Sequence, residues 1–159
     1  MPYRMNASGL KEVNELLGKL EKDAQKVAAR ALYEGAGIMA DEMKRSAEQI
    51  RTEPFRYVKN GTRLPSPEEK AILLAAGTGI AKFDKDGTDV NTSVGYRSSG
   101  YADLNGKTKP IPQIANSINS GTSFMQKQPF VRKAASSGGK KAAAAMKASI
   151  EGAFDEITK

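Results

Sequence analysis

The amino-acid sequence predicts an α+β fold, in which a long N-terminal amphipathic helix and a C-terminal helix pack on a small antiparallel β-sheet. Two observations lead to this prediction. Apolar residues recur at spacings of three and four near both ends of the chain, as on the buried face of a helix. Between these regions, strand-like runs flank an Asp-Gly pair, which favours a hairpin. The length predicts one domain, residues 1–159.

The first predicted helix covers residues 9–50, with Ser8 as its N-cap and Pro54 enforcing its end. Its apolar stripe consists of Leu10, Val13, Leu17, Leu20, Ala24, Val27, Ala31 and Ile38. A continuous helix of this length measures about 60 Å, whereas a compact domain of this size is roughly 30 Å across. The glycines within residues 35–37 favour a kink or close helix packing, and the alternative is a helix that projects toward a partner.

The next segment, residues 51–67, is expected to be a long basic loop, because it holds three prolines, an Asn-Gly pair and several cations. Residues 66–69, Ser-Pro-Glu-Glu, then supply an N-cap, a first-turn proline and charges that suit the helix dipole. They predict a short helix that stops at Gly77.

Strand-like residues 80–83 and 90–96 on either side of Asp86 and Gly87 predict a β-hairpin. Asp84, Asp86 and Asp89 also resemble part of a calcium loop, but the glycine falls too early and no glutamate closes the loop. An aspartate-rich turn is the better interpretation, and we expect no metal site.

Residues 98–112 are expected to be a further loop with a turn at Asn105 and Gly106, followed by a short helix at residues 111–118. Pro129 suits the first position of the final helix. The Ser-Ser-Gly-Gly sequence at residues 136–139 predicts a weak point or a break in that helix.

The composition excludes several kinds of active site. The chain has no Cys and no His, which removes disulfides, cysteine nucleophiles, the usual general base and the usual zinc sites. We therefore expect no cofactor and no enzymatic activity, with an enzyme that uses only Asp, Glu, Lys or Tyr as the third alternative. No apolar run approaches the roughly 20 residues that span a bilayer, so we expect no membrane partner.

The net charge of +7 is concentrated in two segments. Residues 127–147 hold six cations and no acid. Residues 44–63 hold six cations and two acids, and the cations, which are our candidates to face DNA, are Lys44, Arg45, Arg51, Arg56, Lys59 and Arg63. Such residues attract the DNA backbone without sequence preference. A stand-alone basic nucleic-acid-binding protein is therefore an alternative function, although no recognised reader motif is present.

The segment "SINSGTSFMQKQPFVRKAA", residues 117–135, places two phenylalanines beside a turn and a proline. A catalytic loop is disfavoured, because no acid lies between Asp103 and Glu151 to orient a nucleophile. A phosphate cradle is disfavoured because the glycine and lysine spacing does not fit one. Docking to a partner is the remaining functional prediction, beside the alternative that the apolar residues are local core.

Within this segment, Gly121, Thr122, Met125, Pro129, Phe130, Val131, Arg132 and Ala134 form an arrangement that resembles the tail-completion or neck family of long-tailed bacteriophages. The N-terminal "GLKEVNELLGKL" is similar to the opening of such proteins. The resemblance implies a non-enzymatic, head–tail joining subunit of the virion, which is assembled in the host cytoplasm. It also implies a homo-oligomeric ring, most often a hexamer, in contact with connector, head-closure or tail-terminator proteins.

The resemblance assigns subunit or partner contacts to Gly121, Thr122, Phe124, Met125, Pro129, Phe130 and Arg132. Among these, we expect the Gly-Thr pair to make the turn and the proline to start the helix. Phe130 is expected to anchor the helix to the core. Phe124, Met125 and Arg132 are then the candidates for contact between subunits.

Overall fold

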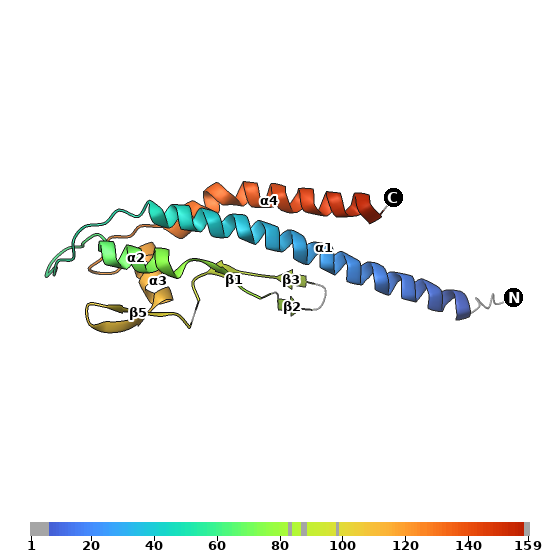
Figure 1. Cartoon of the computed structure of the whole chain (residues 1–159), viewed down its shortest axis with the longest axis horizontal. Helices are drawn as coiled ribbons and strands as arrows, with labels where there is room; N and C mark the ends of the chain where they lie inside the picture. The colour runs from blue at the N-terminus through green and yellow to red at the C-terminus, as the bar shows by residue number, and fades with distance from the viewer. Residues whose placement is uncertain (1–6, 83, 87–88, 98, 158–159) are drawn as a thin grey trace.

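Four helices and six short strands lie in the part of the chain that the computed structural model describes, which is residues 7–82, 84–86, 89–97 and 99–157. The α+β class is therefore confirmed. Figure 1 shows an elongated molecule, in which the long helices α1 (Ala7–Glu48) and α4 (Phe130–Ile157) lie side by side. The strands and two short helices lie along the other side of α1.

Helix α1 is continuous over 42 residues, with no break at residues 35–37. It begins at Ala7, so Ser8 lies inside the helix and is not its N-cap. After Glu48 the chain makes one tighter turn, in which the backbone nitrogen of Ile50 donates to the carbonyl of Ala47 at 3.1 Å. The N-terminal part of α1 extends beyond the end of α4 (Figure 1), so the projecting arrangement is the one observed.

Helices α1 and α4 approach each other closely at two glycines. A Cβ atom on Gly35 of α1 would lie 2.7 Å from Met146 Cγ of α4. A Cβ on Gly138 of α4 would lie 3.0 Å from Met39 Sδ and from Glu42 Cγ of α1. These glycines therefore serve close helix packing. Helix α4 runs unbroken through residues 136–139, so the predicted break is wrong: tertiary packing outweighs the low helix propensity of glycine there.

A buried carboxylate reinforces this helix pair. Glu42 of α1 accepts a hydrogen bond from Lys141 Nζ at 2.9 Å and another from Ser137 Oγ at 3.0 Å. Hydrogen bonds from Lys141 and then Ser137 lower the pKa of Glu42. The Ser-Gly sequence that predicted a break in α4 thus supplies both the close approach and a polar contact.

Two neighbouring glycines of α4 provide a matched test of this packing. An Ala side chain at Gly139 meets open space, so Gly139→Ala should raise the free energy of unfolding by about 0.5–1 kcal/mol through helix propensity. Gly138→Ala has the same propensity gain but must displace Met39 and Glu42, so it should be neutral or destabilising. Urea denaturation of both variants measures the difference. Equal stabilisation by the two would show that the helices are not in close contact at Gly138.

Helix α2 (Pro67–Ala76) begins with the predicted cap. Ser66 Oγ accepts a hydrogen bond from the backbone nitrogen of Glu69 at 3.2 Å, and Glu69 Oε2 accepts one from the backbone nitrogen of Ser66 at 2.7 Å. These reciprocal bonds form a capping box. The helix is followed by Gly77, whose φ of 64° suits a residue without a side chain.

The first predicted hairpin is present in two parts. Strand β1 (Gly79–Ile80) pairs with β4 (Val94–Gly95), and β2 (Asp84–Asp86) pairs with β3 (Asp89–Asn91). Helix α1 contacts β1, β3 and β4. The turn residues 87–88 and the aspartate side chains considered for calcium lie outside what the structure describes. Among the described residues, no group of three acidic side chains could hold a metal.

A second hairpin replaces the predicted loop at residues 98–112. Strand β5 (Tyr101–Leu104) pairs with β6 (Lys107–Pro110), with Leu104 opposite Lys107. Both turn residues, Asn105 and Gly106, have positive φ values of 53° and 73°. Two consecutive positive φ values are the signature of a type I′ hairpin turn. The paired strands thus form three separate two-stranded sheets in the described part of the chain.

The core lies where the C-terminal end of α1 and the N-terminal end of α4 meet α2 and α3 (Ile111–Ser120). Its members are Met43, Ala47, Ile50, Leu73, Leu104, Ile114, Ala115, Ile118, Met125, Phe130 and Ala134. The Phe130 ring packs edge-on against Tyr96, with 6.4 Å between centroids. Helix α3 matches the predicted short helix, and α4 starts one residue after Pro129. No helix in the described part of the chain is long and apolar enough to cross a membrane.

Candidate partner-contact site at the loop end

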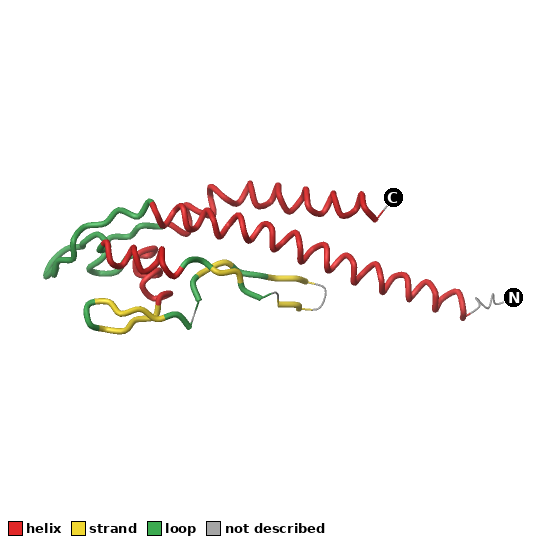
Figure 2. Tube along the Cα trace, viewed as in Figure 1, coloured by secondary structure: helices red, strands yellow, loops and turns green. Residues whose placement is uncertain are grey.

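The candidate contact residues lie at the end of the molecule where α1 ends and α4 begins, which we call the loop end. Figure 2 shows the loops before α2 and before α4 together at this end, with the β5–β6 hairpin beside them. The two loops are joined by backbone hydrogen bonds: the nitrogen of Arg63 donates to the carbonyl of Phe124 at 2.9 Å, and that of Gln126 to the carbonyl of Arg63 at 2.8 Å. Segments far apart in sequence therefore build one surface.

The Gly-Thr pair makes the turn that the sequence predicts. Gly121 follows α3 with a φ of 77°, and its nitrogen donates to the carbonyl of Ser117 at 3.0 Å. A Cβ on Gly121 would lie 3.0 Å from the backbone nitrogen of Lys127, which leaves room only for glycine. Thr122 Oγ1 accepts a hydrogen bond from the nitrogen of Met125 at 3.0 Å. Both residues shape the loop, and neither is fully exposed.

The apolar residues of this segment divide into two groups. Phe130 is 2% exposed and Met125 is 3% exposed, so both belong to the core. The prediction that Phe130 anchors α4 to the core is confirmed, and the burial of Phe130 and Met125 argues against contact of either side chain with another subunit. The bridge between Met125 and Arg63 fixes residue 125 facing inward and its neighbour facing outward. Phe124 is 53% exposed, and Arg132 is exposed on the first turn of α4.

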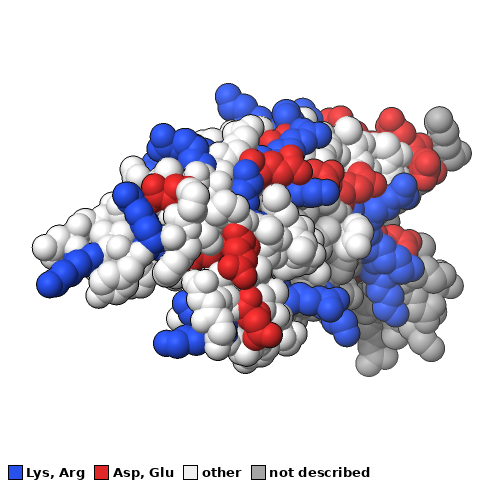
Figure 3. Space-filling view, turned by 60° about the vertical axis from the view of Figure 1, so that its left-hand side comes forward, with Lys and Arg blue, Asp and Glu red and all other residues white. Residues whose placement is uncertain are grey.

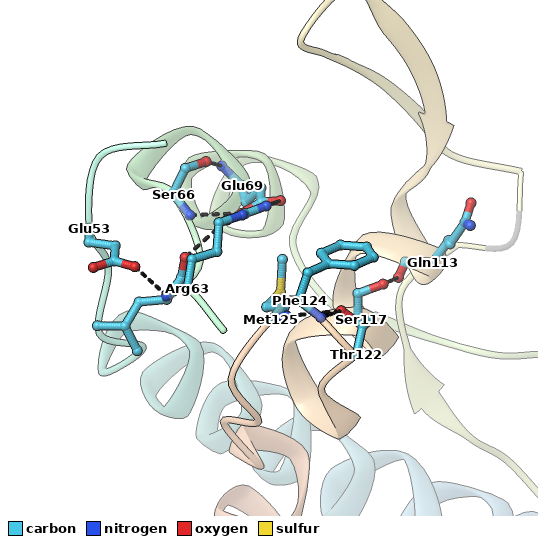
Figure 4. A network of polar contacts seen from close by, with 10 residues as sticks. Glu53, Arg63, Ser66, Glu69, Gln113, Ser117, Thr122, Phe124 and Met125 are labelled. Carbon is cyan, nitrogen blue, oxygen red and sulfur yellow. Dashed lines mark hydrogen bonds and ion pairs between the residues drawn. The ribbon is translucent and has the colours of Figure 1, made fainter. Parts of the chain in front are cut away.

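Arg63 is not available to DNA, which corrects the prediction for this cation. Its side chain is buried, and its guanidinium donates to both carboxylate oxygens of Glu69 at 2.8 Å and to the carbonyl of Leu64 at 2.9 Å. Figure 4 shows the surrounding network, in which Glu53 Oε1 accepts a hydrogen bond from the nitrogen of Leu64 at 2.6 Å. This bidentate ion pair connects the long loop to α2.

The charge state of this pair is fixed by its hydrogen bonds. Burial alone would raise the pKa of Glu69, but the hydrogen bonds from Arg63 and from the backbone of Ser66 outweigh burial and lower the pKa. The same pairing raises the pKa of Arg63. The two groups are therefore both charged near neutral pH, and their charges cancel within the protein.

The other five DNA-facing candidates are exposed: Lys44, Arg45, Arg51, Arg56 and Lys59. Two of them have acidic partners, because Arg45 pairs with Glu42 at 3.2 Å and Arg56 with Glu53 at 3.3 Å. Figure 3 shows acidic groups between the cations on the face it displays, without a continuous basic stripe. These five cations are therefore exposed, and on the face shown in Figure 3 basic and acidic groups are interspersed.

A cleft of about 520 Å³ opens between the two loops and the β5–β6 turn, and we call it the tip cleft. Its lining consists of Phe55, Arg56, Tyr57, Val58, Arg63, Glu69, Leu104, Asn105, Lys107, Lys109 and Phe124. The Arg63 guanidinium stacks on the Phe55 ring, 5.0 Å from its centroid. Sequence reasoning missed Phe55, Tyr57 and the two lysines as site residues. The available signal was a pair of aromatics within a proline-rich loop.

Comparisons with known proteins give no relative for this arrangement: no family model matches the chain, and no curated protein or solved structure is significantly similar to it. The exposed aromatic and cationic side chains of the tip cleft are therefore the main structural guide to function. Among the described residues that line this cleft, the buried carboxylate of Glu69 is paired with Arg63.

Proposed function

We propose that this protein is a non-enzymatic structural subunit of the virion of a long-tailed bacteriophage. It acts at the neck or the head-proximal end of the tail, where a ring of copies joins head and tail. The observation that carries this proposal is the aromatic patch at the loop end, formed by Phe55, Tyr57 and Phe124, whose exposed fractions are 55%, 86% and 53%. Exposed aromatic clusters with a polar rim are typical of protein-contact surfaces.

The projecting part of α1 supports an assembly role. Its backbone continues as helix beyond the end of α4 (Figure 1), and its sequence carries Leu10, Val13 and Leu17 at helical spacing. Apolar residues at this spacing form a stripe that suits packing against another protein surface. A neighbouring subunit or a connector, head-closure or tail-terminator protein would supply that packing.

The proposed ring is supported by these two contact surfaces together with the family resemblance, which implies six copies. A closed ring forms when one patch of a subunit contacts a different patch of the next. Such a subunit resides in the virion and is assembled in the host cytoplasm. Exposed cations that line the central channel of such a ring would make non-specific contacts with DNA that passes through it.

Disrupting the coding sequence in the phage that carries it provides the test. Filled heads and separate tails are expected by electron microscopy, and expression of the chain in trans should restore joined particles. Mass spectrometry should also find the protein in purified particles. Intact particles that form without the protein would contradict the proposal.

The second candidate function is stand-alone nucleic-acid binding, which the exposed Lys44, Arg51 and Lys59 and the basic segment 127–147 favour. Fluorescence anisotropy with duplex and single-stranded DNA separates the two functions. A ring subunit should bind weakly, without sequence selectivity, and lose affinity steeply between about 50 and 200 mM salt. Tight, selective binding at physiological salt would favour the second candidate.

A further inference from the structure

We propose that the tip cleft binds the acidic C-terminal end of α4 from a second copy of this chain, so that copies join head to tail. The proposal rests on the assembly function proposed above and specifies its contact. The cleft and the end of α4 carry complementary chemistry and lie at opposite ends of the molecule.

The rim of the tip cleft is positively charged. Among the described residues that line the cleft, Glu69 is the one with a carboxylate, and both of its oxygens accept hydrogen bonds from the Arg63 guanidinium. Lys107 and Lys109 project from β6, and no ion pair of the described residues involves either one. The cleft therefore combines aromatic walls with an excess of positive charge, which suits an acidic segment that carries an aromatic side chain.

The end of α4 is such a segment. Residues 151–157 hold three carboxylates and no cation, and one of the three, Glu151, pairs with Lys147 of the preceding turn at 3.7 Å. Phe154 is 56% exposed, and Asp155 and Glu156 beside it are exposed. Glu156 lies in the last turn of this helix, where the helix dipole is negative and further negative charge is unfavourable. Contact with a cationic rim would relieve that repulsion.

The placement of the two surfaces requires a second copy. Helix α4 starts at the loop end, since the carbonyl of Phe130 accepts a hydrogen bond from Ser46 Oγ at 2.7 Å. It then runs for 28 residues away from that end, about 42 Å at 1.5 Å per residue, as Figure 1 shows. A chain cannot reach its own cleft with this segment. Contact between unlike patches of successive copies generates a ring or an open filament.

A charge swap tests the contact. One variant carries Lys107→Glu and Lys109→Glu, and the other carries Asp155→Lys and Glu156→Lys. In each variant alone, like charges face each other across the contact. The dissociation constant for self-association, measured by sedimentation velocity, should therefore be at least tenfold higher than that of the unmodified chain. The equimolar mixture restores opposite charges at every contact and should regain association. Lys133→Glu with Lys140→Glu, the same charge change on exposed positions of α4, should leave association unchanged.

Disulfide trapping tests the same contact independently of the charge swap. The chain has no native cysteine, so any disulfide must join introduced residues. Mixed Lys107→Cys and Glu156→Cys chains, distinguished by tags of different size, should give a mixed dimer upon oxidation. Neither variant should cross-link to itself, and Lys133→Cys should not cross-link to Glu156→Cys.

Two results would overturn the head-to-tail contact: self-association of either charge variant at the unmodified level, or absence of both the restored association and the mixed disulfide. If the protein is nevertheless found in purified particles and is needed to join heads to tails, the proposed function stands with a different contact. Loss of DNA binding in the Lys107→Glu, Lys109→Glu variant, together with a failed swap, would identify the cleft as a nucleic-acid site instead.

Discussion

Phe130→Ala should lower the free energy of unfolding by about 3–5 kcal/mol, the usual cost of removing a buried aromatic side chain. Phe130 is 2% exposed and packs against Tyr96 at the point where α4 meets the core. A domain of ordinary stability has about 5–15 kcal/mol in total, so the variant should be close to unfolding. Urea denaturation followed by circular dichroism measures the loss.

Phe124→Ala is the matched control, because it removes the same type of side chain from an exposed position in the loop before α4. Its unfolding free energy should change by no more than about 0.5 kcal/mol. Particle assembly should nevertheless weaken, because binding energy at interfaces is concentrated in a few aromatic anchors. If Phe124→Ala destabilises the isolated subunit as strongly as Phe130→Ala, Phe124 is a core residue and its contact role is wrong.

Glu69→Gln should cost about 3–5 kcal/mol of stability, because it leaves the buried guanidinium of Arg63 without its counter-charge. Glu68→Gln is the control, since Glu68 lies next to it on the exposed side of α2 and should change stability by less than about 0.5 kcal/mol. Replacing both members of the pair, by Arg63→Met with Glu69→Leu, should cost less than Glu69→Gln alone. Equal effects of Glu69→Gln and Glu68→Gln would mean that the ion pair does not hold the loop.

The same pair predicts how stability depends on pH. The pKa of Glu69 is lowered from its ordinary value of 4.5 in the folded state, so the folded protein binds its proton less readily than the unfolded chain. Its contribution is therefore complete above pH 4.5 and is lost as the pH falls through the lower folded pKa. Unfolding free energies measured from pH 7 to pH 3 should fall less steeply for Glu69→Gln than for the unmodified chain.

Features that depend on neighbouring residues in the chain could be predicted from the sequence. The cap at Ser66 and the turn at Gly121 use backbone groups within a few residues, so their sequence signals suffice. The apolar periodicity likewise predicts α1, and the position of Phe130 just after a proline predicts its role at the start of α4. The elements themselves were therefore largely predictable.

Features that depend on distant segments could not be predicted in the same way. In the sequence, Arg63 cannot be distinguished from the exposed cations around it. In the fold, residue 63 forms a β-bridge with Met125, and its buried side chain pairs with Glu69. In the sequence, Gly138 indicates a weak point in the helix. In the fold, Met39 of α1 lies where a side chain at residue 138 would be, which explains the glycine. The β5–β6 hairpin has an Asn-Gly turn signal, but its strands carry lysines and only Leu104 is buried, so the alternating pattern is weak. The tip cleft combines three such segments.

Electron cryomicroscopy of purified virions directly tests whether this chain forms a ring between head and tail. We expect a closed ring of copies of this chain at the junction of head and tail, with α1 and α4 recognisable as a pair of long helices. Phe124 and the tip cleft should lie against a neighbouring protein. A junction that contains no copy of the chain, or a single copy whose loop end faces solvent, would contradict it.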